Sequence, residues 1–126
     1  MENIHIDATQ YTPEITLDAS GSVSMVGKSY PENTFEFYKP VMAWLEAYFR
    51  DGDVHKTTVM MEIIYFNSSS SKLFFDFFDL LEEASGNGKE IEVSWVYDGE
   101  NESAQEAGED FKEDFESLNF NLVVKA

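Results

Sequence analysis

Four consecutive hydroxyl side chains, Ser68 to Ser71, follow an apolar stretch and precede a segment with helical periodicity. At a helix N-terminus such side chains lie beside backbone N–H groups without intrahelical acceptors, where the helix dipole favours a negative group. A phosphate ester there would add a charge of about -1.5 to -2 and three acceptor oxygens. A catalytic serine would need a neighbouring base, which the sequence does not place there. The run therefore indicates a regulatory phosphorylation site.

Helix capping explains part of the same run. Asn and Ser are favoured N-cap residues, so we expect Asn67 or one of the serines to cap the helix. One cap does not require four serines in a row. The interaction of a phosphate with a helix N-terminus is worth only about 0.3–1 kcal/mol, whereas an unmatched charge buried in an interface costs several kcal/mol. We therefore expect phosphorylation to act on partner docking and not on folding.

The segment after the serines is rich in aromatic residues. At about 100° per residue, Leu73, Phe77 and Leu80 share one apolar stripe, which is typical of core packing. Phe75 falls on the opposite side of this helix. An exposed aromatic side chain is a candidate hot spot for a partner. We predict that Phe75 contacts the partner that the phosphate repels.

Other chemistry has little support in the sequence. His5 and His55 belong to no ligand or nucleophile motif, and G-x-S-x-G, P-loop and G-x-G-x-x-G patterns are missing. The acidic residues between Glu100 and Glu116 are more typical of a solvated helix face than of a metal site. The chain has no cysteine, which excludes disulfides, thiolate zinc sites and a cysteine nucleophile. We expect a binding protein without cofactor, metal or enzymatic activity.

The formal net charge of -17, from 25 acidic and 8 basic residues, argues against binding to nucleic acid or to an anionic membrane surface. A protein partner with a basic patch is the natural complement. The first residues lack the basic stretch and apolar run of a signal peptide. No apolar segment approaches the roughly 20 residues that span a bilayer. These features predict a cytoplasmic protein.

Hydrophobic periodicity predicts the elements that must position these residues. Short strands are expected at residues 4–6 and within residues 14–27, where a turn at residues 18–21 separates the two strands of a hairpin. Further strands are expected at residues 57–66, 91–97 and 120–124, and helices at residues 34–50, 68–84 and 104–115. Asn33 and Glu36 fit a capping box at the first helix. Residues 57–66 are almost continuously apolar, so we expect a central strand covered on both faces or nearly so.

The alternation of strands and helices implies crossover connections and a largely parallel interior of the sheet. No linker, repeat or Pro-rich tract divides the 126 residues. The sequence therefore predicts a single α/β domain, residues 1–126, with a mixed sheet of about five strands and about three flanking helices.

Several segments resemble the SiaC family of bacterial regulatory phosphoproteins. They are residues 29–33, 65–72, 79–84 and 111–114. The Ser-Tyr-Pro-Glu-Asn segment and the Tyr-x-Asn-[Ser/Thr]-Ser-Ser pattern are the most specific, and the similarity covers essentially the whole chain. The resemblance implies a fold like that of the STAS-type anti-sigma factor antagonists, with a phosphoacceptor at the start of a helix.

The resemblance also implies partner switching. A cognate kinase with a GHKL-type ATP-binding domain would phosphorylate the hydroxyl directly after the Asn, here Ser68, and a PP2C-type metal-dependent phosphatase would remove the phosphate. The unphosphorylated form would bind an effector, in characterised systems a diguanylate cyclase whose activity it promotes. This links the family to cyclic-di-GMP, biofilm formation and aggregation. Better-known members have Thr at the acceptor position and an apolar residue where this chain has Ser71.

The residues expected to contact the partners surround the acceptor. They are Asn67, Ser69, Ser70, Ser71, Lys72 and Phe75. Ser69 and Ser70 fit equally well as helix caps or as kinase contacts, and the number of modified serines stays open. Two other classes also stay open: an anti-sigma factor antagonist whose partner is an anti-sigma kinase, and a small hydrolase that uses one of the serines.

Overall fold

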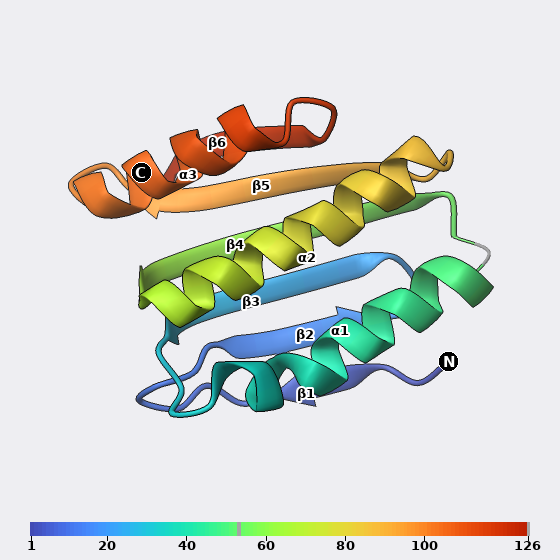
Figure 1. Ribbon diagram of the computed structural model, residues 1–126, viewed down its shortest axis with the longest axis horizontal. Coiled ribbons are helices and arrows are strands. Elements are labelled where there is room, and N and C mark those ends of the chain that lie inside the picture. The colour runs from blue at the N-terminus through green and yellow to red at the C-terminus, as the bar shows by residue number, and fades with distance from the viewer. Residues whose placement is uncertain (53, 126) are drawn as a thin grey trace.

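The computed structural model describes residues 1–52 and 54–125, and within them strands and helices form a six-stranded sheet with three helices (Figure 1). The strands are β1 (Ile4–Ile6), β2 (Glu14–Asp18), β3 (Ser22–Ser29), β4 (Lys56–Phe66), β5 (Glu90–Asp98) and β6 (Asn119–Lys125). The helices are α1 (Thr34–Asp51), α2 (Ser68–Gly86) and α3 (Glu102–Asp114). The predicted mixed α/β fold is confirmed, with one strand more than the expected number of about five.

The strands lie in the sheet in the order of the sequence. β1, β2 and β3 pair antiparallel, whereas β3, β4, β5 and β6 pair parallel. One helix connects each parallel pair. Right-handed crossovers that all step in the same direction place their helices on the same face, and Figure 1 shows α1, α2 and α3 on one side of the sheet. Within residues 1–52 and 54–125, no helix covers the other face.

Burial along β4 alternates because helices cover only one face of the sheet. Val59, Met61 and Ile63 are buried on the helical side. Met60 is partly exposed and Ile64 is 53% exposed on the other side. The prediction that this strand is covered on both faces is therefore wrong. Its nearly continuous apolar composition does not reflect two-sided burial.

The hydrophobic core lies between the sheet and the helices. α2 contributes most of the predicted apolar stripe and the two phenylalanines beside it, whereas Leu80 is only partly buried. The buried apolar residues of α2 are Leu73, Phe74, Phe77, Phe78, Leu81 and Ala84. α3 approaches β5 closely at Gly108, where a Cβ atom would come within 2.5 Å of Trp95 Cδ1. Trp95 Nε1 donates to the carbonyl of Ala104 at 2.9 Å, so this tryptophan fixes α3 on the sheet.

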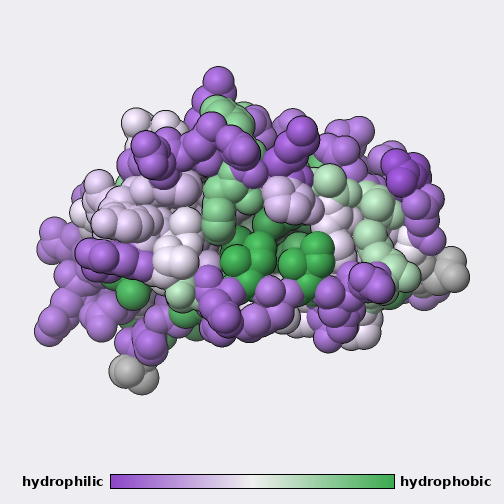
Figure 2. Space-filling model, turned by 90° about the horizontal axis from the view of Figure 1, so that it is seen from below, coloured by the Kyte–Doolittle hydropathy of each residue, from purple (hydrophilic) through white to green (hydrophobic). Residues whose placement is uncertain are grey.

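The surface is dominated by polar side chains, in keeping with the net charge of -17. Figure 2 shows this for the side on which β1 lies, where the most hydrophobic side chains form a central patch among mostly hydrophilic ones. β1 forms this edge of the sheet, and its Ile4 and Ile6 are half-buried against the core. In the part of the chain that the structure describes, no helix is long and apolar enough to cross a membrane.

Candidate phosphorylation site and docking groove

The serine run lies at the carboxyl end of an interior strand, because α2 begins almost directly after β4. Asn67 caps α2: its Oδ1 accepts a hydrogen bond from the N–H of Ser70 at 2.9 Å. The N–H of Asn67 donates to the carbonyl of Ser29 on β3 at 3.2 Å. Of the capping residues that the sequence allowed, Asn67 or one of the serines, Asn67 is therefore the cap. Its backbone also connects the junction to the neighbouring strand β3.

The four serines lie in different environments because successive helical residues point in directions about 100° apart. Ser68 and Ser69 are exposed, and Ser71 is half-buried. Ser70 is fully buried, with 0% of its surface exposed. The expectation that Ser70 contacts a partner is therefore corrected, since its side chain points into the protein.

Ser70 belongs to a buried chain of three hydroxyls. Its Oγ lies 2.7 Å from the Oγ of Ser29, which in turn lies 2.6 Å from the hydroxyl oxygen of Tyr38. Burial raises the pKa of Tyr38 to about 12, against a smaller lowering by the Ser29 hydrogen bond. This network was not predicted from the sequence. Ser29 belongs to the Ser-Tyr-Pro-Glu-Asn segment of the family resemblance, but no sequence pattern indicated that its hydroxyl bonds to Ser70 and Tyr38.

An open groove of about 670 Å³ lies between α2 and α3, beside the first turn of α2. Its lining residues are Phe66, Ser68, Ser71, Lys72, Phe75, Asp76, Ala107, Asp110, Phe111 and Asp114. Of the described residues that line it, Lys72 alone is basic, whereas Asp76, Asp110 and Asp114 are acidic. The groove thus combines apolar side chains with negative charge, which suits a basic amphipathic segment of a partner.

Four of the predicted site residues meet in this groove: Ser68, Ser71, Lys72 and Phe75. Ser69 is exposed but does not line the groove. The sequence had assigned the acidic residues of α3 to a solvated face. Asp110 and Asp114 are exposed, as expected, but they also line the groove, and only the packing of α3 beside α2 reveals this.

Phe75 is exposed, as the helical phase predicts, with 45% of its surface accessible. However, its ring also packs against another aromatic side chain. The ring centroid of Phe75 lies 4.9 Å from that of Phe115, which directly follows α3. One side of the ring is thus packed and the rest is available to a partner.

The N-terminus of α2 differs electrostatically from those of the other helices. α1 and α3 carry Glu36 and Glu102 in their first turns, whereas the first turn of α2 holds no acidic residue. The positive end of the α2 dipole is therefore not neutralised by its own side chains. A negative group on Ser68 would meet no carboxylate within that turn.

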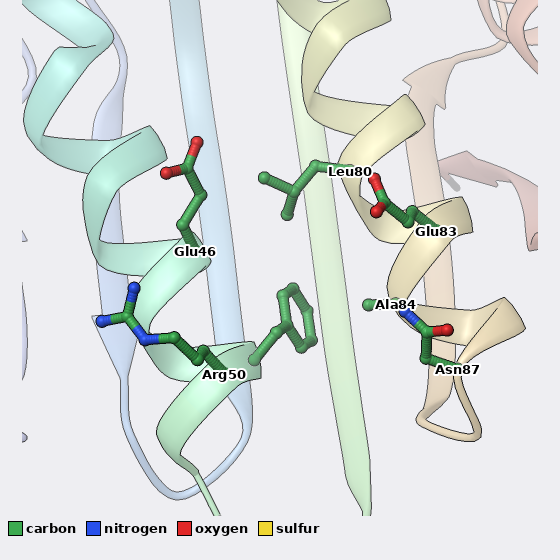
Figure 3. A pocket seen from close by; sticks show the side chains of 7 residues that line it. Glu46, Arg50, Leu80, Glu83, Ala84 and Asn87 are labelled. Atoms are coloured by element: carbon green, nitrogen blue, oxygen red, sulfur yellow. The ribbon is translucent and has the colours of Figure 1, made fainter.

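A second hollow, of about 240 Å³, lies between the C-terminal halves of α1 and α2. Figure 3 shows Glu46 and Arg50 on α1, and Leu80 on α2 pointing towards α1. Leu80 follows Ser68 by 12 residues, which is about 18 Å along a helix. This hollow is therefore separate from the serine site.

One group of side chains could accept a metal ion. Single ligand atoms of His5, Asp7 and Glu14 all lie within 4.8 Å of one another. All three residues are exposed, and the distances from His5 Nε2 to the two carboxylates, 3.1 and 3.5 Å, are those of a surface ion pair. The cluster lies on and next to β1 and β2, which are three and two strands away from β4.

In this mixed α/β fold, exposed hydroxyls lie at a strand-to-helix junction beside an open groove, an arrangement that suits a regulatory protein that binds partners. The model of the SiaC family of regulatory phosphoproteins matches residues 6–125. The chain belongs to this family, as the sequence resemblance indicated.

Solved structures agree with this assignment. A structure of SiaC from Pseudomonas aeruginosa is 37% identical, with a TM-score of 0.86 over 100% of this chain and 99% of its own. A crystal structure of the diguanylate cyclase SiaD in complex with its activator SiaC, from the same organism, matches with a TM-score of 0.85 and 38% identity over 96% of this chain and 97% of the matched one.

A protein relative is also similar over its full length. An uncharacterized protein of Pseudomonas aeruginosa strain UCBPP-PA14 is 41% identical over 127 aligned residues, which cover 100% of this chain and 98% of that protein. Since the similarity extends from end to end, the family assignment covers both the sheet and the serine site.

Proposed function

We propose that this chain, as one domain of residues 1–126, is a phosphorylation-controlled partner-switch protein and that Ser68 is the phosphoacceptor. One observation carries the proposal: Ser68 is exposed in the first turn of α2 and lines the α2/α3 groove. A phosphate there adds about -1.5 to -2 charges to a groove that already holds three carboxylates. A docked partner would have to bury this dianion, and its desolvation would cost more than the basic residues of the partner return.

In this proposal a GHKL-type kinase phosphorylates Ser68 and a PP2C-type phosphatase reverses the reaction. The unphosphorylated protein binds a diguanylate cyclase as its effector, in the cytoplasm, and so acts in cyclic-di-GMP signalling and biofilm formation. The support for the effector is that a relative, SiaC, is the activator of the cyclase SiaD. The protein itself catalyses no reaction.

The docking surface comprises the groove residues Ser68, Ser71, Lys72 and Phe75, with Ser69 beside them as a contact for the kinase. Asn67 contributes indirectly, because its side chain is engaged in capping α2. Phe75 provides the aromatic anchor, and Asp110 and Asp114 provide the charge that attracts basic residues of the partner.

The first experiment measures the affinity of the cyclase for the unmodified protein and for protein made with phosphoserine at position 68. We expect at least about a tenfold loss, which corresponds to about 1.4 kcal/mol. Protein with phosphoserine at position 69 is the matched control, since Ser69 is also exposed but does not line the groove. Equal affinities for the unmodified and the position-68 forms would contradict the proposal.

The second experiment identifies the acceptor and the effector in the host. Intact-mass and peptide mass spectrometry after reaction with the kinase should place one phosphate on Ser68 and none on a Ser68→Ala variant. Modification at Ser69 or Ser71 instead would overturn the acceptor assignment. A pull-down from the native host should recover a cyclase. Recovery of an anti-sigma kinase would instead identify the protein as an anti-sigma factor antagonist that controls transcription.

A further inference from the structure

The side chain of Lys72 lies between the serine site and α1. Its Nζ is 5.8 Å from the centroid of the Phe35 ring, which is near the outer limit of a cation–π contact. Phe35 is 54% exposed, so this contact is open to solvent. At the same time Lys72 lines the α2/α3 groove together with Ser68.

Ser68 and Lys72 are four residues apart on α2, so their side chains lie on the same side of the helix. A cation at this spacing can reach a phosphate one turn earlier. The other charged groups around the groove are carboxylates: Asp76 of α2, and Asp110 and Asp114 of α3. Among the described groove residues, a phosphate on Ser68 therefore has a single cationic partner.

From this arrangement we propose that Lys72 is the internal counter-ion of phosphorylated Ser68, and that phosphorylation draws its ammonium group away from Phe35. The proposal rests on the proposed function, since it takes Ser68 as the acceptor. A dianionic phosphate attracts an ammonium group more strongly than the face of an exposed phenyl ring does. Phosphorylation thus changes two places together: it adds charge to the groove and uncovers the ring of Phe35 on α1.

The test uses the whole protein with phosphoserine at position 68 and requires neither kinase nor effector. The second pKa of the phosphate is measured by phosphorus NMR as a function of pH. In a Lys72→Met variant, which keeps a long apolar side chain without the charge, this pKa should rise by about 0.15–0.4. The same pKa in both proteins would overturn the proposal.

Lys39→Met is the matched control. Lys39 lines a hollow with Phe35 between α1 and α2 but does not line the groove that contains Ser68. We expect the phosphate pKa of this variant to equal that of the parent. An equal rise in both variants would show only the general loss of positive charge and would also overturn the assignment.

Proton NMR provides a second measurement, which observes the side chain of Lys72 and not the phosphorus signal. In the unmodified protein the ε-methylene signals of Lys72 should be shielded by the ring of Phe35, and a Phe35→Leu variant should lose that shielding. Phosphoserine at position 68 should abolish it as well. Persistent shielding in the phosphorylated protein would exclude the movement. Because no partner is present, such a failure leaves the docking experiment with the cyclase unaffected.

Discussion

The side-chain oxygens of Ser29 and Ser70 lie 2.7 Å apart, although 41 positions separate the two residues in the chain. Ser29 ends β3, Ser70 lies in the first turn of α2, and both are completely buried. Ser29 is also within 2.6 Å of the Tyr38 hydroxyl of α1. A strand and two helices therefore meet at one hydroxyl, and the α2 member of this network, Ser70, lies two residues after the exposed Ser68.

The central position of Ser29 predicts an order of stabilities. Ser29→Ala removes the partner of two buried hydroxyls and should lower the free energy of unfolding by about 2–4 kcal/mol. Ser70→Ala leaves Ser29 paired with Tyr38 and should lower it by about 1–2 kcal/mol. Urea unfolding followed by circular dichroism measures both. Equal losses, or the reverse order, would contradict a network centred on Ser29.

Tyr38 should make stability depend on pH in the alkaline range. Burial raises its pKa to about 12 in the folded protein, against about 10 in the unfolded chain. Its contribution is fully present below about pH 10, where both states are protonated, and declines as pH rises towards about 12, because only the unfolded chain ionises. The total loss is roughly 2–3 kcal/mol.

The measurement for Tyr38 compares the free energy of unfolding of the wild type with that of Tyr38→Phe across this range. Phe cannot ionise, so the wild type should lose stability relative to the variant as pH rises. Other groups titrate in both proteins and cancel in the difference. Parallel pH profiles would show that Tyr38 ionises normally.

The cap of α2 should affect phosphorylation as well as stability. Asn67→Ala is expected to lower the free energy of unfolding by about 1 kcal/mol and to slow phosphorylation of Ser68, because the first turn of α2 loses its anchor. Asn101→Ala is the control, since Asn101 caps α3 by accepting from the N–H of Ala104 at 3.1 Å. It should destabilise to a similar extent. A kinase assay with equal slowing in both variants would attribute the effect to general destabilisation.

Much of this fold follows from local patterns. The predicted helices and strands are found with small shifts at their ends, because hydrophobic period and caps are properties of neighbouring residues. Asn33 caps α1 as expected, because its Oδ1 accepts from the N–H of Glu36 at 3.2 Å. The Glu36 carboxylate accepts from the side-chain Nδ2 of Asn33 at 3.1 Å, in place of the backbone N–H that a complete capping box would use.

Features that depend on distant partners were not predictable in the same way. The apolar composition of β4 does not reveal that all crossovers step in one direction and leave Met60 and Ile64 on an uncovered face. The burial of Ser70 depends on Ser29, and four identical side chains in a row give no signal of which one turns inward. The helical phase placed Phe75 outside correctly, but it could not show the neighbouring Phe115.

Phe75 provides the sharpest test of the docking groove. Phe75→Ala removes an aromatic side chain that is 45% exposed, so the folded protein should lose only the contact with Phe115, worth about 0.5–1.5 kcal/mol. Affinity for the cyclase should fall by more, at least about tenfold, since aromatic anchors dominate interfaces.

Ile64→Ala is the matched control for Phe75. Ile64 is 53% exposed, but it lies on the sheet face opposite the helices and thus away from the groove. Its truncation should leave the affinity for the cyclase unchanged, as measured by isothermal titration calorimetry. If Phe75→Ala binds as tightly as the wild type, or if Ile64→Ala weakens binding as much, the effector docks elsewhere. A phosphate on Ser68 would then act on that complex by a route other than the cost of burying the dianion in the groove.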